Sequence, residues 1–271
     1  MNAAPLLSAS GLAAGYPGRR VIENLDLQIA PGRLTMIIGA NASGKSTLLG
    51  VLARLTAPEA GTVRLDGIDV ATIPRRQFAQ TVGLLPQQPT APDGITVAEL
   101  VSRGRHPHRG VFSRWSAEDS RLVDEAMTKT GVAGLADRPV GDLSGGQRQR
   151  VWIAMALAQT PRILMLDEPT TFLDLSHQIE VLDLLIQLNR AESTTIVVVL
   201  HDLNLAARYA DDLVIMSDGR VVAHGPPAHV LTAEVIAEAF SLDALVMDDP
   251  LTGAPMIVPV PGGAHTRADT A

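Results

Sequence analysis

LTMIIGANASGKST, residues 34–47, joins an apolar run to a glycine-rich turn and then to a helix-forming segment. Its second half fits the pattern G-x-x-x-x-G-K-[ST], and the strand before it and the helix after it are the context that this pattern requires. The amides of such a loop hold phosphates, Lys45 reaches the β and γ phosphates, and Ser46 ligates Mg²⁺. The stretch therefore predicts a nucleoside triphosphate site. Its expected contacts are Gly39, Ala40, Asn41, Ala42, Ser43, Gly44, Lys45, Ser46 and Thr47.

A second apolar run, RILMLDEPT at residues 162–170, contains two adjacent carboxylates. A purely structural strand hardly places paired charges without a counter-ion, because burying a charge is costly. Successive side chains of an extended chain point in opposite directions, so we expect Asp167 to face Mg²⁺ and Glu168 to polarise an attacking water. His201 follows a third apolar run and is expected at the same sheet edge, where α/β proteins bind ligands. A lone histidine at such a place is more often structural.

The stretch LSGGQRQR, residues 143–150, places a serine and two glycines ahead of a helical run. Glycine costs about 1 kcal/mol inside a helix, so its presence at this start needs a reason. Ser144 is a candidate N-cap, while Gly145 and Gly146 remove the side chains that would keep a ligand away from the free amides. This helix start is therefore predicted to suit an anion.

Composition narrows the class of protein. The chain has 271 residues, 46% of them hydrophobic, which is ordinary for a globular protein with a real core. Its formal charge of −7 argues against a protein that mainly holds nucleic acid. The absence of cysteine excludes disulfides and thiolate metal sites. No apolar run reaches the ~18 residues that span a bilayer, and without a basic n-region we expect no signal peptide.

The pattern along the chain predicts an α/β fold. Residues 1–87 are mostly β, with a hairpin at Asp66-Gly67, and 161–249 alternate strands with helices, which implies a parallel sheet. We assign these two segments to one discontinuous core. Residues 88–160 read as an inserted helical subdomain that contains a helix capped by Ser116. Residues 250–271, rich in Gly, Pro, Ala and Thr, are expected to form a tail without a packed fold.

The order of these motifs resembles the nucleotide-binding subunit of ATP-binding cassette (ABC) transporters, over nearly the whole chain. The resemblance implies a P-loop NTPase fold of the ABC ATPase type, with an antiparallel β subdomain and an inserted helical subdomain. It implies that Tyr16 stacks on adenine and that His201 contacts the γ-phosphate. It further implies that Gln87 lies in a loop linking the catalytic metal and water to the helical subdomain, and that residues 171–174 touch a partner subunit.

The same resemblance explains the glycine pair Gly145-Gly146. It implies a head-to-tail dimer that sandwiches two ATP molecules with Mg²⁺. Each ATP is completed from the opposite chain by Ser144, Gly145, Gly146 and Gln147. Ala40 and Ala42 depart from the commonest pattern, in which proline and glycine are frequent. If position 42 requires positive φ, alanine adds about 1 kcal/mol of strain, which affects nucleotide affinity rather than nucleotide identity.

Four stretches are similar to importers of iron(III) siderophores, with haem and cobalamin importers as relatives. They are VAELVSRGRHPHRG (97–110), LSGGQRQRVWIAMALAQ (143–159), PTTFLDLSHQIEVLDLL (169–185) and DDPLTGAPMIVPV (248–260). The resemblance implies membrane permease subunits, an extracytoplasmic substrate-binding protein, and a place at the cytoplasmic face of the membrane. His106 and His108, flanked by Arg103, Arg105 and Arg109, are expected to form a solvated basic surface rather than a metal site.

Other classes fit less well. ABC-type ATPases of DNA repair would carry a long coiled coil between the two glycine motifs, translation members would carry two cassettes, and both would be more basic. A small-molecule kinase leaves LSGGQ and Gln87 unexplained. Glu168 and His201 argue against a binding module without hydrolysis.

Overall fold

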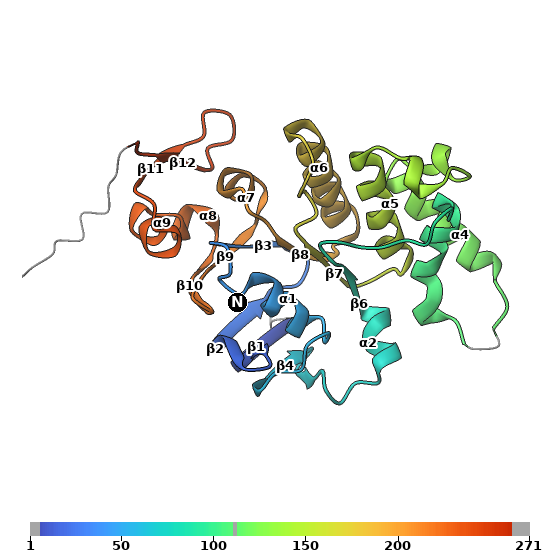
Figure 1. Ribbon diagram of the computed structural model, residues 1–271, viewed down its shortest axis with the longest axis horizontal. Helices are drawn as coiled ribbons and strands as arrows, with labels where there is room; N and C mark the ends of the chain where they lie inside the picture. The colour runs from blue at the N-terminus through green and yellow to red at the C-terminus, as the bar shows by residue number, and fades with distance from the viewer. Residues whose placement is uncertain (1–5, 111–112, 262–271) are drawn as a thin grey trace, which may run out of the picture.

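The chain folds around a central six-stranded sheet, which runs across the middle of the molecule in Figure 1. The computed structural model describes residues 6–110 and 113–261. The strand order is β10-β9-β3-β8-β7-β6; β10 runs antiparallel to β9 and the other pairs are parallel. The strands are β3 (Leu34–Gly39), β6 (Val82–Leu85), β7 (Ile163–Asp167), β8 (Thr195–Val199), β9 (Asp212–Ser217) and β10 (Arg220–Gly225). The predicted parallel α/β core is confirmed.

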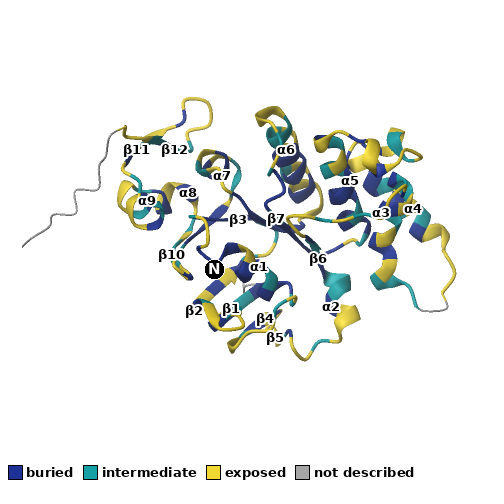
Figure 2. Ribbon diagram, in the orientation of Figure 1, coloured by how far each residue is buried: buried dark blue, intermediate teal, exposed yellow. Residues whose placement is uncertain are grey.

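This sheet is buried on both faces, which explains the apolar sequences of its strands. Along β3, Met36 packs into one core and Ile37 into the other, because successive side chains alternate. Helices α6 (Leu175–Glu192) and α7 (Leu203–Tyr209) cover one face, and α1 (Lys45–Leu52) covers the other. In Figure 2 the dark-blue, buried parts of the ribbon lie along the sheet and on the sides of these helices that face it.

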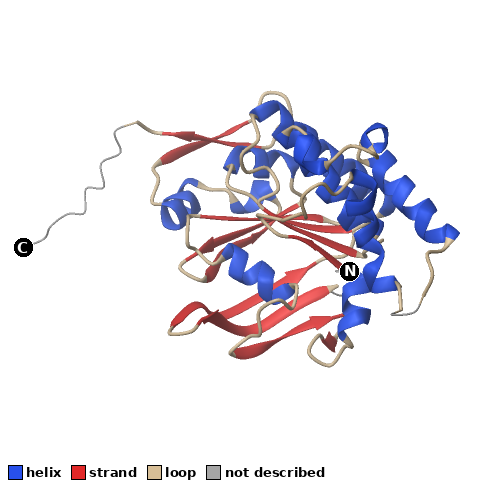
Figure 3. Ribbon diagram, turned by 45° about the vertical axis from the view of Figure 1, so that its right-hand side comes forward, coloured by secondary structure: helices blue, strands red, loops and turns tan. Residues whose placement is uncertain are grey.

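A second, antiparallel sheet lies beyond α1, so that the helix is held between two layers of strands (Figure 3). Its order is β2-β1-β4-β5. The strands are β1 (Leu7–Tyr16), β2 (Arg19–Ile29), β4 (Ala60–Leu65) and β5 (Ile68–Asp69). The predicted hairpin at Asp66-Gly67 is confirmed, and both residues have positive φ, as short hairpin turns require.

Helix α1 ends at Leu52. Arg54 adopts a φ of 59°, and the amide of Leu55 donates to the carbonyl of Gly50 at 2.8 Å. The chain therefore closes the helix with a left-handed residue that is not glycine, a signal that apolar periodicity cannot reveal.

A group of helices lies between β6 and β7 in the sequence and at one end of the central sheet in space (Figure 1). The helices are α3 (Val97–Ser102), η1 (Arg103–His108), α4 (Ala117–Lys129), η2 (Ala133–Leu135), η3 (Val140–Asp142) and α5 (Gly145–Ala158), and α2 (Arg75–Thr81) precedes β6. The predicted cap at Ser116 is confirmed: its hydroxyl accepts from the amide of Asp119 at 3.1 Å.

Arg105 is buried inside this group, so its expected place on a solvated basic surface is wrong. Its Nε lies 3.0 Å from Oδ1 of Asp119, and its Nη1 donates to the carbonyl of Ala158 at 2.8 Å. The guanidinium thus joins η1, α4 and the end of α5. His106 is exposed, whereas Nε2 of His108 lies 2.8 Å from the carbonyl of Gln159.

The expectation that residues 250–271 lack a packed fold is wrong for the part that the structure describes. β11 (Ala244–Asp248) pairs with β12 (Pro255–Pro259), after α8 (Pro227–Val230) and α9 (Ala233–Phe240). Ile257 is buried, and its amide and carbonyl both bond to the side chain of Asn204 on α7. These contacts fix a strand that the Pro and Gly content obscures. Residues 262–271 lie outside the described residues.

Candidate functional site

The loop of residues 39–47, called the P-loop below, turns sharply from β3 into α1. A Cβ on Gly39 would meet the carbonyl oxygen of Met216 at 2.3 Å, so only glycine fits there. Gly44 has a φ of 101°, which favours glycine. Nζ of Lys45 donates to the carbonyls of Gly39 and Ala40 at 2.8 and 2.9 Å. The lysine therefore ties the start of α1 to the start of the loop.

Ala42 has a φ of 63°, the condition under which the sequence predicts strain. An alanine in the left-handed region costs about 1 kcal/mol, because its Cβ approaches the neighbouring backbone. The side chain is exposed, so it makes no packing contact that would offset this cost. Position 42 is thus a strained point in the P-loop.

Lys45 is buried, and burial lowers the pKa of its ammonium group, while Glu168 and Asp167 act in the opposite direction. Because two carboxylates already lie beside this one buried cation, a further anionic group such as a phosphate would need a second cation. The buried hydroxyl of Ser43, within the same loop, has no hydrogen-bond partner among the described residues. A polar ligand oxygen would satisfy it, so the loop fits a phosphate.

Ser46 and Asp167 form the corner where a metal ion fits. Oγ of Ser46 donates to Oδ1 of Asp167 at 3.0 Å, bringing together a hydroxyl and a carboxylate from α1 and β7. Burial raises the pKa of Asp167, and the Ser46 hydrogen bond only partly opposes this. Hard oxygen ligands of this kind suit Mg²⁺, which takes few protein ligands and keeps waters or phosphates for the rest.

Glu168 stands at the centre of a cluster of polar side chains. Its Oε1 lies 2.6 Å from Nε2 of His201, and its Oε2 accepts from Nε2 of Gln87 and, at 3.1 Å, from Oγ1 of Thr171. The carboxylate is buried. All hydrogen bonds to it leave its oxygens in the acceptor role, as a general base requires. Thr171 was expected only in the loop that faces a partner, so its bond to Glu168 is new.

The expectation that Glu168 lies on an extended chain is wrong. β7 ends at Asp167, and Glu168 has a φ of 50°. The two carboxylates still point to different partners, because this left-handed residue turns the chain away from the sheet. Asp167 contacts the P-loop serine, whereas Glu168 contacts His201 on the loop after β8.

A cavity of about 210 Å³ lies against the P-loop. Besides residues of the P-loop, its walls include Tyr16, Glu168 and His201, as the sequence predicts. Tyr16 is 58% exposed, so its side chain is accessible to a ligand. Arg19 and Val21 of β2 also line this cavity, and no motif in the sequence indicates them.

The segment 143–147, called the signature segment below, lies away from this cavity. Ser144 caps α5: its hydroxyl accepts from the amide of Gln147 at 3.3 Å, and the Gln147 side chain accepts from the amide of Ser144 at 3.2 Å. Gly145 is exposed but Gly146 is buried. Within the described residues, no member of the segment lines the P-loop cavity. One chain therefore holds two separate candidate half-sites.

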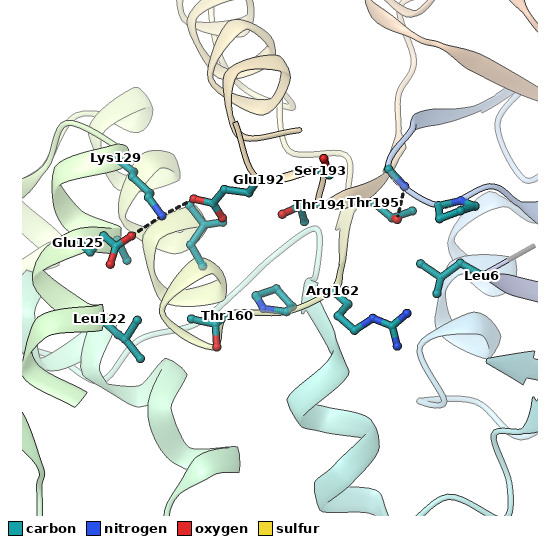
Figure 4. Close-up of a pocket in the computed structure, with 15 residues that line it drawn as sticks. Leu6, Leu122, Glu125, Lys129, Thr160, Arg162, Glu192, Ser193, Thr194 and Thr195 are labelled. Atoms are coloured by element: carbon teal, nitrogen blue, oxygen red, sulfur yellow. Dashed lines mark hydrogen bonds and ion pairs between the residues drawn. The ribbon is translucent and has the colours of Figure 1, made fainter. Parts of the chain in front are cut away.

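A larger cavity, of about 320 Å³, lies near the opposite edge of the sheet, beside the starts of β3 and β8. Figure 4 shows Lys129 of α4 reaching across it to Glu192 at the end of α6, with Glu125 also within 2.7 Å. The single ammonium lies between two carboxylates, so this group carries a net negative charge. The cavity joins the helical group to the core, and its paired charges offer a nucleotide nothing comparable to the P-loop.

The residues that the structure describes include no helix long and apolar enough to cross a membrane.

Known proteins were compared with the chain. The ABC transporter family profile matches residues 22–171. The ferric enterobactin transport ATP-binding protein FepC of Escherichia coli strain K12 is 48% identical over 264 residues, which are 97% of this chain and 97% of that protein. A solved inward-facing structure, assigned to the metal-chelate type of ABC transporter, has a TM-score of 0.82 at 27% identity and covers 94% of this chain and 98% of that chain. A bacterial ABC transporter cassette solved as a dimer has a TM-score of 0.71 at 29% identity, covering 81% of this chain and 98% of that chain.

Proposed function

Since this chain belongs to the ABC transporter family, we propose that it is the ATP-hydrolysing subunit of a membrane importer that takes up a metal chelate, namely an iron(III) siderophore. The predicted ABC ATPase fold is confirmed by the solved relatives. The observation that carries the hydrolytic part is the cluster around Glu168, in which three side chains hold one buried carboxylate beside the P-loop.

The chain's own residues account for binding. The P-loop amides and Lys45 hold the β and γ phosphates of ATP, and Lys45 leaves its carbonyl partners to do so. The exposed side chain of Tyr16 stacks on adenine. Ser46 and Asp167, together with Gln87, hold Mg²⁺. When bound, this ion supplies positive charge to the phosphate oxygens.

Hydrolysis follows from the position of Glu168. Its carboxylate accepts a proton from the water whose oxygen attacks the γ-phosphorus, while the bond to the β-γ bridging oxygen breaks. His201, which lies 2.6 Å from the carboxylate, donates to a γ-phosphate oxygen once ATP is present. Thr171 keeps the carboxylate oriented through its 3.1 Å hydrogen bond.

The second half-site supports a dimer. Ser144, Gly145, Gly146 and Gln147 present a capped helix start outside the chain's own nucleotide cavity. In a head-to-tail pair, each signature segment closes over the ATP of the other copy, so both sites are completed at once. The dimeric cassette among the solved relatives supports this arrangement. Opening and closing of the pair then converts hydrolysis into movement.

Cargo and partners rest on the relatives. One transports ferric enterobactin, an iron(III) chelate, and another is of the metal-chelate type. We therefore assign the chain to the cytoplasmic face of the membrane, bound to permease subunits that receive the chelate from an extracytoplasmic binding protein. Importers of haem or cobalamin are the alternative within the same group. The net charge of −7 argues against nucleic acid as a partner.

The test compares the wild-type chain with Glu168→Gln and with Glu238→Gln, a control at an exposed glutamate on α9. Glu168→Gln is expected to bind Mg-ATP, to lose turnover by about 10²- to 10³-fold and to accumulate as a dimer, because the water is no longer polarised while phosphate contacts remain. Glu238→Gln is expected to behave as wild type. Normal turnover by Glu168→Gln would disprove its assignment.

Uptake of labelled ferric siderophores, haem and cobalamin by iron-starved cells identifies the cargo. Cells with wild-type chain take up one chelate class and cells with Glu168→Gln do not. Unchanged uptake of every ferric siderophore, with ATPase activity intact in the purified wild type, would remove the iron assignment and keep the ATPase.

A further inference from the structure

The start of α5 is covered by a side chain of the same molecule. The ring of His177, on the first turn of α6, lies over Gly146: a Cβ built on that glycine would meet Cδ2 of the ring at 2.4 Å and Cγ at 3.1 Å. Real Cβ atoms do not approach this closely, so any side chain at 146 displaces the histidine. The reason that the sequence suggests for Gly146, free access for a ligand, is therefore incomplete.

The ring is partly exposed and is tied to the cap of its own helix. Its Nδ1 lies 2.6 Å from Oδ1 of Asp174, and the same carboxylate oxygen accepts from the amide of His177 at 3.0 Å and from the hydroxyl of Ser176 at 2.9 Å. Asp174 thereby caps α6, and the same carboxylate holds the ring of His177. To make room at Gly146, the histidine would have to give up this bond.

The residue that caps α6 ends the loop 171–174, which begins beside Glu168. Thr171 donates to the Glu168 carboxylate at 3.1 Å, and its amide donates to the Glu168 carbonyl at 3.2 Å. Leu173 lies 3.4 Å from the Cβ position of Gly145, and its carbonyl accepts from Gln178 at 2.8 Å. The loop therefore contacts the candidate base at one end and Gly145 at the other, while His177, bound to its last residue Asp174, covers Gly146.

We propose that His177 is a positioning residue that fixes the signature segment to loop 171–174, so that the helix start offered to a second copy is held in register with the chain's own Glu168. The proposal rests on the proposed function, because the signature segment acts only in an ATP-bound dimer. His177 touches neither the P-loop nor Glu168 in the contacts described, so its role is distinct from catalysis.

This role predicts which step fails when the ring is removed. Nucleotide binding by one chain uses the P-loop and Tyr16, which lie in another cavity, and it stays unchanged. ATP-driven pairing uses the signature segment. A shift of this helix start by about 1 Å is expected to weaken pairing on the order of 10- to 100-fold. Loss of a residue with a merely structural role would lower stability without separating nucleotide binding from ATP-driven pairing.

The experiment uses the full chain with Glu168→Gln, in which pairing is stable, and measures dimer formation against Mg-ATP by light scattering after gel filtration. His177→Ala is expected to raise the ATP concentration for half-maximal pairing about tenfold or more. Binding of fluorescent ADP by the single chain is expected to stay the same. His229→Ala, at an exposed histidine on α8, is the matched control and should change neither quantity.

A second pair of variants tests the contact itself. Gly146→Ala is expected to impair pairing, and adding His177→Ala should cost less than the two single losses combined, because the clash disappears with the ring. Gly145→Ala should gain nothing from His177→Ala, since its Cβ position faces Leu173. Where Gly146→Ala fails to fold in a thermal melt, the single His177→Ala variant still decides.

Pairing by His177→Ala at the ATP concentration of its parent would overturn the proposal. So would a double variant whose loss equals the two single losses combined, which would show that Gly146 and His177 act independently. A parent Glu168→Gln chain that stays single at saturating ATP is a different result, and it would overturn the dimer in the proposed function.

Discussion

Two glycine-containing helix starts in this chain use glycine for different reasons. In the P-loop, Gly44 and Ala42 adopt positive φ, so the backbone itself is unusual. In the signature segment, neither Gly145 nor Gly146 has positive φ, and the N-cap Ser144 has ordinary extended angles. There the missing side chain permits a close contact. A glycine motif therefore predicts a ligand site, but it does not show whether glycine is needed for its backbone conformation or for the space that its missing side chain leaves.

The two starts are also held by different forces. The P-loop joins buried strand β3 to α1, which is packed between two sheets. The signature helix α5 belongs to the helical group, whose η1, α4 and α5 are tied by the buried pair of Arg105 and Asp119. Apolar burial supports both helices, and the buried ion pair is an additional support of the second. The following predictions separate these supports.

The largest expected effect comes from Arg105→Ala, which leaves Asp119 buried without its cation. Breaking such a pair costs about 3–5 kcal/mol of unfolding free energy. Urea unfolding measures the loss, with Arg103→Ala, its exposed neighbour, as control. ADP binding at the P-loop by the chain that remains folded should persist. A loss below 1 kcal/mol would mean that the pair does not support the helical group.

Lys45→Ala removes the cation of the P-loop and is expected to reduce ATP turnover by about 10²- to 10³-fold, because a preorganised donor to the phosphates is lost. The only other lysine in the sequence, Lys129, supplies the control. Lys129→Ala breaks partly exposed ion pairs and should cost no more than about 1 kcal/mol of stability, with turnover retained. Wild-type turnover by Lys45→Ala would exclude the P-loop from the reaction.

Acid should weaken the helical group through Asp119. The hydrogen bond from Ser116, with that from Arg105, lowers the pKa of Asp119 to about 2, below its value near 4 in an unfolded chain. A lowered pKa stabilises the fold above the unfolded value, and this contribution is lost as pH falls from about 4 to about 2. Unfolding measured across this range should show a steeper loss for wild type than for Asp119→Asn. Parallel curves would contradict this assignment.

The smallest expected effect is a gain in nucleotide affinity. Ala42→Gly relieves the left-handed residue of the P-loop and should tighten nucleotide binding by up to about fivefold, or roughly 1 kcal/mol. Calorimetric titration with ADP measures it. Ala40→Gly is the control, because Ala40 has no positive φ to relieve. Equal affinity in all three chains would show that the strain is offset elsewhere in the loop.

Sequence reasoning located the features that depend on local chemistry. The caps at Ser116 and Ser144 and the strand-loop-helix of the P-loop follow from residues within one turn of each other, and the structure contains them. The roles assigned to the nucleotide contacts remain predictions. The sequence could not indicate contacts that depend on packing between distant elements, such as His177 over Gly146 or Asn204 on Ile257.

Two errors have the same origin. Arg105 was placed at the surface because a charged residue among histidines resembles a solvated face, yet its partner Asp119 lies fourteen residues away on another helix. Glu168 was placed on an extended chain because the apolar run continues up to it, yet its left-handed φ depends on what surrounds the strand end. Neither environment is visible in a window of sequence.

The separation of the two half-sites within one chain has a genetic consequence. If Lys45→Ala disables the half-site at the P-loop and Ser144→Arg disables the half-site at the signature segment, a mixed dimer carries both defects in one composite site and leaves the other intact. Two defective alleles expressed together in equal amounts would give about half of the assemblies this mixed composition. Each allele alone would give no intact site, so the pair should complement each other.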